Sequence, residues 1–108
     1  MSIRLPAAID RYVKAENSGD VEALAECFAP DAVVRDEGRT YRGLAAIKAW
    51  KAATKKKYNH TVAPLDVVRR GGRTVLKVRL SGNFPGSPVT LEFSFVLEGG
   101  KIASLEIG

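Results

Sequence analysis

The chain has 108 residues, 45% of them hydrophobic and 27% charged, and its formal net charge is +5. This composition is typical of one globular domain and excludes a disordered chain, and the longest apolar run is too short to span a membrane. Residues 1–9 contain one arginine and lack the apolar stretch of a signal peptide, so we expect a cytoplasmic protein.

The chain contains one cysteine and one histidine. A single cysteine cannot form an internal disulfide, and together with one histidine it cannot build a zinc site, so we expect neither a metal nor a cofactor. Cys27 lies beside Phe28 near the end of a predicted helix. That position is typical of a small buried hydrophobic residue, and a reactive thiol is the alternative.

The basic residues fall into two groups, one in a lysine-rich segment and one around a predicted hairpin turn: Lys48, Lys51, Lys55, Lys56 and Lys57, then Arg69, Arg70 and Arg73. They form either a phosphate-binding face or a solvated helix flank and a hairpin tip. No aromatic residues alternate with the lysines, as base stacking would require, so we do not expect nucleic-acid binding.

Two helices are predicted in the first thirty residues. Apolar residues recur at helical spacing in the first helix, at Leu5, Ala8, Ile9, Tyr12 and Val13. Pro6 suits its first turn, and Asn17-Ser18-Gly19 is typical of its end. Asp20 caps a second helix, which Pro30 ends. The apolar stripe of this second helix consists of Val21, Leu24, Ala25 and Phe28.

A short strand, a turn and a third helix are predicted next. The strand covers residues 32–36 and is rich in valine. Glu37-Gly38 forms the turn, and residues 39–42 return as a partner strand. Gly43 opens a helix that runs to about Lys57, with Ile47 and Trp50 on one side and lysines on much of the other.

Four longer strands complete the chain, over residues 59–69, 73–81, 89–97 and 101–107. The turns between them are Gly71-Gly72, a rigid loop over residues 85–88, and Gly99-Gly100. Leu76, Val78 and Leu80 alternate with basic residues, which predicts an antiparallel sheet with one covered face. Helices first and hairpin strands after them predict one α+β domain over residues 1–108, with helices on one face of a curved sheet.

This order of elements resembles the nuclear transport factor 2-like superfamily, which includes ketosteroid isomerases and polyketide-cyclase-like (SnoaL-like) proteins. The matching stretches are Arg11-Tyr12-Val13, Asn17-Ser18-Gly19-Asp20, Phe28-Ala29-Pro30-Asp31-Ala32-Val33, Asp36, Gly43 with Ala45-Ala46-Ile47, and Gly100-Lys101-Ile102. The resemblance implies a cone: a strongly bent sheet and three N-terminal helices that enclose an apolar pocket for a small apolar molecule.

The resemblance also implies a homodimer that packs through the sheet. Apolar residues on both faces of the last strands agree with it, because they exceed what one core face needs. They are Val89, Leu91, Phe93, Phe95 and Leu97 on one face, with Val96 and Ile102 on the other.

Two catalytic residues follow from the same resemblance. Asp36 falls where the isomerases have the aspartate that shuttles a proton next to a carbonyl. Apolar surroundings at a pocket mouth would desolvate its charge and suit it to proton transfer, whereas the alternative is a plain surface turn. Tyr12 falls where the isomerases have a tyrosine that donates a hydrogen bond to the oxyanion, and the alternative is a core tyrosine bonded to backbone.

A further isomerase group, a protonated aspartate on the penultimate strand, corresponds to Glu92 when residues are counted back without gaps from Gly100-Lys101. Either Glu92 or its neighbours Phe93 and Phe95 face the pocket, since a shift of one residue exchanges the two faces. In the second case Glu92 is a surface residue and the oxyanion site is incomplete.

The remaining predicted pocket residues are apolar or aromatic, with one histidine. Trp50 forms a pocket wall or simply packs on the sheet. His60 is either a pocket acid–base group or an exposed residue at a strand edge. Phe84 lies in a loop that can rim the pocket. Val34 and Phe28 are expected in its apolar lining.

Two functions of different kind follow. The first is a cofactor-free domain that binds a small apolar molecule and acts as an isomerase, cyclase or dehydratase, with Asp36 as base and Tyr12 as donor. The second is a non-catalytic ligand-binding or protein-interaction module, in which the dimer or the basic face is what functions.

Overall fold

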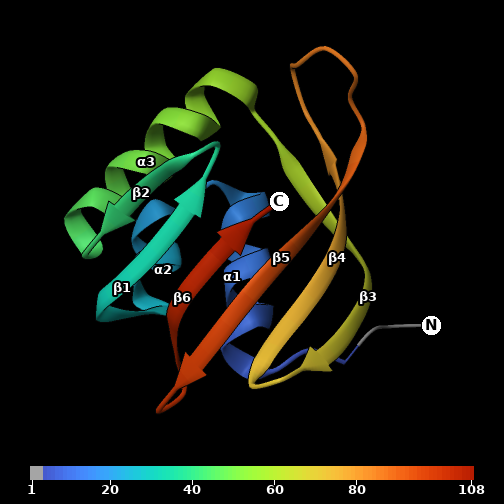
Figure 1. Ribbon diagram of the computed structural model, residues 1–108. Coiled ribbons are helices and arrows are strands. Elements are labelled where there is room, and N and C mark those ends of the chain that lie inside the picture. The colour runs from blue at the N-terminus through green and yellow to red at the C-terminus, as the bar shows by residue number, and fades with distance from the viewer. Residues whose placement is uncertain (1–3) are drawn as a thin grey trace.

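Three helices and six strands form the part of the chain that the computed structural model describes, residues 4–108 (Figure 1). The helices are α1 (Ala7–Ser18), α2 (Val21–Glu26) and α3 (Leu44–Tyr58). The strands are β1 (Phe28–Asp36), β2 (Arg39–Arg42), β3 (Thr61–Arg70), β4 (Arg73–Ser81), β5 (Val89–Glu98) and β6 (Lys101–Ile107). No helix within residues 4–108 is long and apolar enough to cross a membrane.

The six strands form one sheet in the order β2-β1-β6-β5-β4-β3. Neighbouring strands are antiparallel except β1 and β6, which run in the same direction. The helices gather on one side of this curved sheet (Figure 1). Helix α3 contacts β1 and β2, while α1 contacts β3 and β6. The predicted α+β class, with helices on one face of a mostly antiparallel sheet, is confirmed.

Helix α1 is held by its apolar face and by its predicted end. Ile9 and Tyr12 are fully buried, and burial of each such side chain contributes roughly 1.5–3 kcal/mol. Gly19 ends the helix in the left-handed conformation, with φ of 74°. Asp20 then caps α2, because its carboxylate accepts a hydrogen bond from the backbone N–H of Ala23 at 3.0 Å.

Helix α2 is shorter than predicted. It ends at Glu26, and Phe28 is the first residue of β1 rather than the last of the helical stripe. Pro30 therefore lies inside a strand. The pairing of β1 with β6 is irregular between Phe28 and Val33, so the N–H that proline lacks is not needed for the ladder.

The connection from α3 to β3 also differs from the prediction. Asn59 was expected to start the strand, but it caps α3 in the left-handed conformation at φ 46° and ψ 45°. Strand β3 begins two residues later, at Thr61. His60 thus lies in the connection, between the end of one element and the start of the next.

Strand β5 presents its phenylalanines to the helices. Phe93 is 3% exposed and Phe95 is fully buried, whereas Glu92 is exposed on the outer face. Ile102 is also fully buried in the core, so its expected place on the outer face is wrong. The homodimer inferred partly from that residue stays a prediction.

Candidate functional site

A cavity of about 430 Å³ lies where the ends of several elements meet. Its walls come from the end of α1, the second half of α3, the ends of β1, β4 and β6, the first half of β5, the loop between β4 and β5, and the connection before β3. This volume is typical of a site for a small molecule. The sheet topology explains the place, because β1 and β6 run parallel and finish at the same edge, next to the end of α3.

The cavity has an apolar wall and a polar wall. The apolar wall is supplied mainly by the sheet and the loop between β4 and β5: Leu80, Phe84, Val89, Leu91, Phe93 and Ile107. The polar wall is supplied by Glu16, Asp36, Lys51, Thr54 and His60. A ligand with an apolar body and a few polar atoms matches this division.

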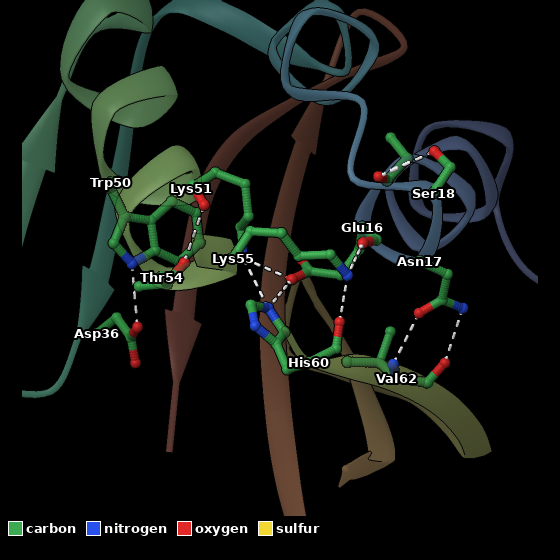
Figure 2. Close-up of polar contacts among 11 residues, drawn as sticks. Glu16, Asn17, Ser18, Asp36, Trp50, Lys51, Thr54, Lys55, His60 and Val62 are labelled. Atoms are coloured by element: carbon green, nitrogen blue, oxygen red, sulfur yellow. Dashed lines mark hydrogen bonds and ion pairs between the residues drawn. The ribbon is translucent and has the colours of Figure 1, made fainter. Parts of the chain in front are cut away.

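Asp36 lies at one end of the polar wall. It is the last residue of β1, is half-buried, and accepts a hydrogen bond from Trp50 Nε1 to its Oδ2 atom at 3.0 Å (Figure 2). Trp50 is only 3% exposed, and its ring packs against the ring of Tyr41 at a centroid distance of 5.8 Å. The indole therefore fixes the carboxylate through Oδ2. The Asp36 Oδ1 atom has no hydrogen bond within residues 4–108.

Three buried charged or titratable side chains form the other end of the polar wall; we call Glu16, Lys51 and His60 the buried cluster. Lys51 Nζ donates to Glu16 Oε1 at 2.6 Å, and His60 Nε2 contacts the same oxygen (Figure 2). Lys51 Nζ is also 3.4 Å from His60 Nε2 and 4.0 Å from the centroid of the Trp50 ring. The three side chains are 1–7% exposed.

The buried cluster shifts the pKa values of its members. Burial alone would raise the pKa of the Glu16 carboxyl, but the His60 hydrogen bond and the Lys51 ammonium outweigh it and lower that pKa to about 2. Burial lowers the pKa of Lys51, and the Glu16 carboxylate opposes this shift. Glu16 is therefore ionised at neutral pH, and its negative charge favours the protonated form of Lys51.

Two neighbouring side chains fix the backbone around the buried cluster. Lys55 Nζ donates to the carbonyl of Glu16 at 2.8 Å and also to the carbonyl of His60. The last turn of α1 contains no basic residue of its own, so Lys55 supplies the cation that favours a helix C-terminus. Asn17 bonds to both backbone groups of Val62, at 3.0 and 2.7 Å, and so ties α1 to β3 (Figure 2).

Four of the predicted site residues line the cavity: Asp36, Trp50, His60 and Phe84. His60 is 5% exposed, so the interpretation of an exposed strand-edge histidine is wrong. Four other predicted residues do not line the cavity: Tyr12, Phe28, Val34 and Glu92. Phe28 and Val34 belong to the core, and Glu92 lies on the outer face, 3.9 Å from Arg70.

Tyr12 is a core residue in the structure. It is fully buried, and its ring meets the edges or faces of Phe28, Phe93 and Phe95 at centroid distances of 5.5–6.3 Å. Its hydroxyl has no hydrogen-bond partner within residues 4–108. Burial, and after it the Glu16 carboxylate, raises the pKa of Tyr12 well above its ordinary value.

Sequence reasoning missed Glu16 and placed Lys51 among solvated lysines. The signal was present in the spacing. Glu16 follows Tyr12 by four residues on the apolar face of α1, and Lys51 follows Ile47 by four on the buried face of α3. A glutamate and a lysine on the apolar faces of two helices indicate that the charges meet inside.

Cys27 is a buried residue of the core. The cysteine is 4% exposed, and burial raises the pKa of its thiol, which agrees with a small buried hydrophobic residue. Within residues 4–108 no three His, Cys, Asp or Glu side chains gather closely enough to hold a metal ion.

A model of the SnoaL-like domain matches residues 9–105 of the chain. No curated protein matches the chain. One similar solved structure is a proposed polyketide cyclase from Sinorhizobium meliloti. It is 44% identical, covers 96% of this chain and 95% of its own, and gives a TM-score of 0.92.

Two more distant structures share the fold. A protein from Catenulispora acidiphila with a ketosteroid isomerase-like fold, solved with trimethylamine, is 23% identical, covers 97% of this chain and 86% of its own, and has a TM-score of 0.84. A protein from Mycobacterium tuberculosis is 19% identical, covers 99% of this chain and 92% of its own, and has a TM-score of 0.82.

Proposed function

The chain belongs to the SnoaL-like domain family, and we propose that it moves a proton on a small, largely apolar carbonyl compound, as an isomerase or a cyclase with Asp36 as the general base. The observation that carries the proposal is a carboxylate fixed by one hydrogen bond at the edge of a mainly apolar cavity. A general base contributes roughly 10²- to 10⁴-fold to a rate when it is held within reach of the proton.

The donor to the developing oxyanion is Lys51 rather than Tyr12. The Tyr12 hydroxyl does not line the cavity, whereas the Lys51 side chain does. One ammonium N–H of Lys51 is used by Glu16 at 2.6 Å, which leaves donors for a ligand oxygen. A fixed cation that meets developing negative charge in an apolar site stabilises a transition state more strongly than water does.

The reaction proceeds through an enolate. Asp36 takes a proton from the carbon next to the carbonyl. The Lys51 ammonium donates a hydrogen bond to the enolate oxygen and so stabilises its negative charge. Return of the proton to another carbon gives isomerisation. In a cyclisation the enolate carbon attacks a second carbonyl and closes a ring, and the alkoxide that forms takes the proton back from Asp36. The 44% identity to a proposed polyketide cyclase supports the second outcome.

The test uses a simple carbon acid, 2-tetralone, and follows exchange of its α-protons with deuterium by NMR. We expect wild type to accelerate the exchange and Asp36→Asn to lose about 10²-fold or more of that acceleration. Glu106→Gln is the control, since it removes an exposed carboxylate that does not line the cavity. Equal exchange with wild type and Asp36→Asn would contradict the role of Asp36.

The homodimer is a second part of the proposal. What supports it is that two large apolar residues of the edge strand β3 are exposed, Leu65 to 42% and Val68 to 39%. Sedimentation at micromolar concentration should give the mass of two chains. A monomer under those conditions would remove this part and leave the pocket chemistry untouched.

A further inference from the structure

His60 has one ring nitrogen that is occupied and one that is not. Nε2 contacts Glu16 Oε1, while Nδ1 is buried and has no hydrogen-bond partner within residues 4–108. Native proteins rarely leave such an atom unpaired, because a buried polar atom without a partner is costly. His60 also lines the cavity, so a group bound there is a candidate partner for this atom.

The partners of Nε2 decide what Nδ1 can do. An ionised carboxylate only accepts hydrogen bonds, so the Nε2 atom in contact with Glu16 must carry the hydrogen. Lys51 already places one positive charge against this carboxylate at 2.6 Å. The neutral tautomer with its hydrogen on Nε2 satisfies this contact without a second positive charge beside Lys51. Neutral imidazole with a hydrogen on Nε2 has a bare Nδ1, which is a hydrogen-bond acceptor.

The ring is also oriented by its surroundings. Across a five-membered ring the two nitrogens point in widely different directions, so Nδ1 points away from Glu16 (Figure 2). The backbone of His60 is fixed by Lys55. Gly82 packs directly behind the residue, since a Cβ atom there would lie 3.0 Å from His60 Cα. These contacts restrict movement of the His60 backbone, from which the ring projects.

Two other polar atoms near the buried cluster lack partners, and they suit each other. Glu16 Oε2 is an acceptor and the Tyr12 hydroxyl is a donor. The two residues are one helical turn apart on the same face of α1, the spacing at which helical side chains meet. Beyond the effect of burial, their interaction raises the pKa of Tyr12 and lowers that of Glu16, so the two groups lie close together. Paired with each other, they leave His60 Nδ1 as the acceptor that only a ligand or a water molecule can satisfy.

We propose that His60 Nδ1 accepts a hydrogen bond from a hydroxyl group of the ligand, so that the cavity selects hydroxylated apolar compounds such as phenols and enols. This inference rests on the proposed function of the cavity as a small-molecule site. It adds the substrate class: an apolar body against the sheet, an acidic carbon near Asp36, and a hydroxyl group at His60.

The test compares two probes that differ in one hydrogen-bond donor, 2-naphthol and 2-methoxynaphthalene. Both have an oxygen that can accept from Lys51, but only naphthol can donate to His60. We expect wild type to bind naphthol about tenfold or more tightly than the ether, measured by calorimetry.

Two variants separate recognition from folding. His60→Phe removes the acceptor, and the two probes should then bind with equal affinity. His60→Asn keeps an amide oxygen near the place of Nδ1, so the preference for naphthol should return at least in part. Both variants lose the contact with Glu16, so both should lose stability, which thermal unfolding measures. A shared loss of stability cannot produce a naphthol preference in His60→Asn that is absent from His60→Phe.

Three outcomes overturn the inference. They are equal binding of both probes to wild type, an unchanged preference in His60→Phe, and no binding of naphthol to wild type at millimolar concentration. Asp36→Asn distinguishes this inference from the proposed reaction. It should abolish deuterium exchange but keep the naphthol preference, whereas failure of wild type to exchange tetralone would remove the reaction and leave the hydroxyl preference standing.

Discussion

The two ends of the polar wall hold their charges in opposite ways. Asp36 is half-buried and has one fixed hydrogen bond, to Trp50, so it can change its charge without disturbing the core. Glu16 and Lys51 are at most 5% exposed and form a buried ion pair at 2.6 Å. The difference teaches that the base can be changed without cost to the fold, whereas a change to the ion pair at the other end affects folding as well as the ligand.

The largest effect is expected where the buried cluster loses its cation. Lys51→Met leaves the Glu16 carboxylate buried without its ammonium, and removal of one partner from such a pair costs about 3–5 kcal/mol. Urea unfolding measures the loss. Lys14→Met is the control, because its ion pair with Asp10 is exposed and worth under about 1 kcal/mol. A loss no larger than that of the control would show that the pair is not buried.

Protonation of Glu16 should destabilise the protein at acid pH. Its pKa is lowered from 4.5 to about 2, so its stabilisation is complete above pH 4.5 and disappears as the pH falls toward 2. The loss is on the order of 3 kcal/mol, since one pKa unit corresponds to about 1.4 kcal/mol. Between pH 5 and 2.5, the free energy of unfolding should therefore fall more steeply for wild type than for Glu16→Gln. Parallel curves would contradict the lowered pKa.

A smaller effect is expected at Gly82, which supports the His60 end. A Cβ atom there would lie 2.8 Å from the Tyr58 carbonyl and 3.0 Å from His60. Gly82→Ala should cost about 1–3 kcal/mol, the usual range for overpacking. Gly108→Ala is the control, since its Cβ would meet nothing within 4 Å. If both substitutions have the same effect on the urea midpoint, the loop does not press on His60.

The smallest effect on stability is expected at Asp36. Asp36→Asn keeps an oxygen that accepts from Trp50 Nε1, so the free energy of unfolding should change by under about 1 kcal/mol while the exchange reaction is lost. A loss comparable to that of Lys51→Met would remove the contrast between the two ends of the cavity.

Much of the fold could be predicted because its signals are local. The turns at Glu37-Gly38, Gly71-Gly72 and Gly99-Gly100 lie where predicted, and β4 and β6 have the predicted bounds. The second helix was drawn too long because Phe28 continues its apolar spacing. Only the irregular pairing of β1 with β6 makes Phe28-Ala29-Pro30 a strand, and that pairing joins residues more than seventy positions apart.

The site could be predicted only in part. Asp36 and Trp50 follow from the family resemblance and Phe84 from its place in a loop, and all three line the cavity. The buried cluster joins α1, α3 and the start of β3, and no local pattern shows that three such distant segments meet. Tyr12 was expected to reach the ligand, but three phenylalanine rings surround it in the core.

The most direct test of the cavity as a ligand site uses the single tryptophan and the single histidine, which lie at its two ends. Addition of 2-naphthol to isotope-labelled protein should shift the indole N–H signal of Trp50 and the ring signals of His60, with saturation at the same ligand concentration. Shifts confined to the outer face of the sheet, with both ring signals unmoved, would contradict the proposal that this cavity binds the substrate.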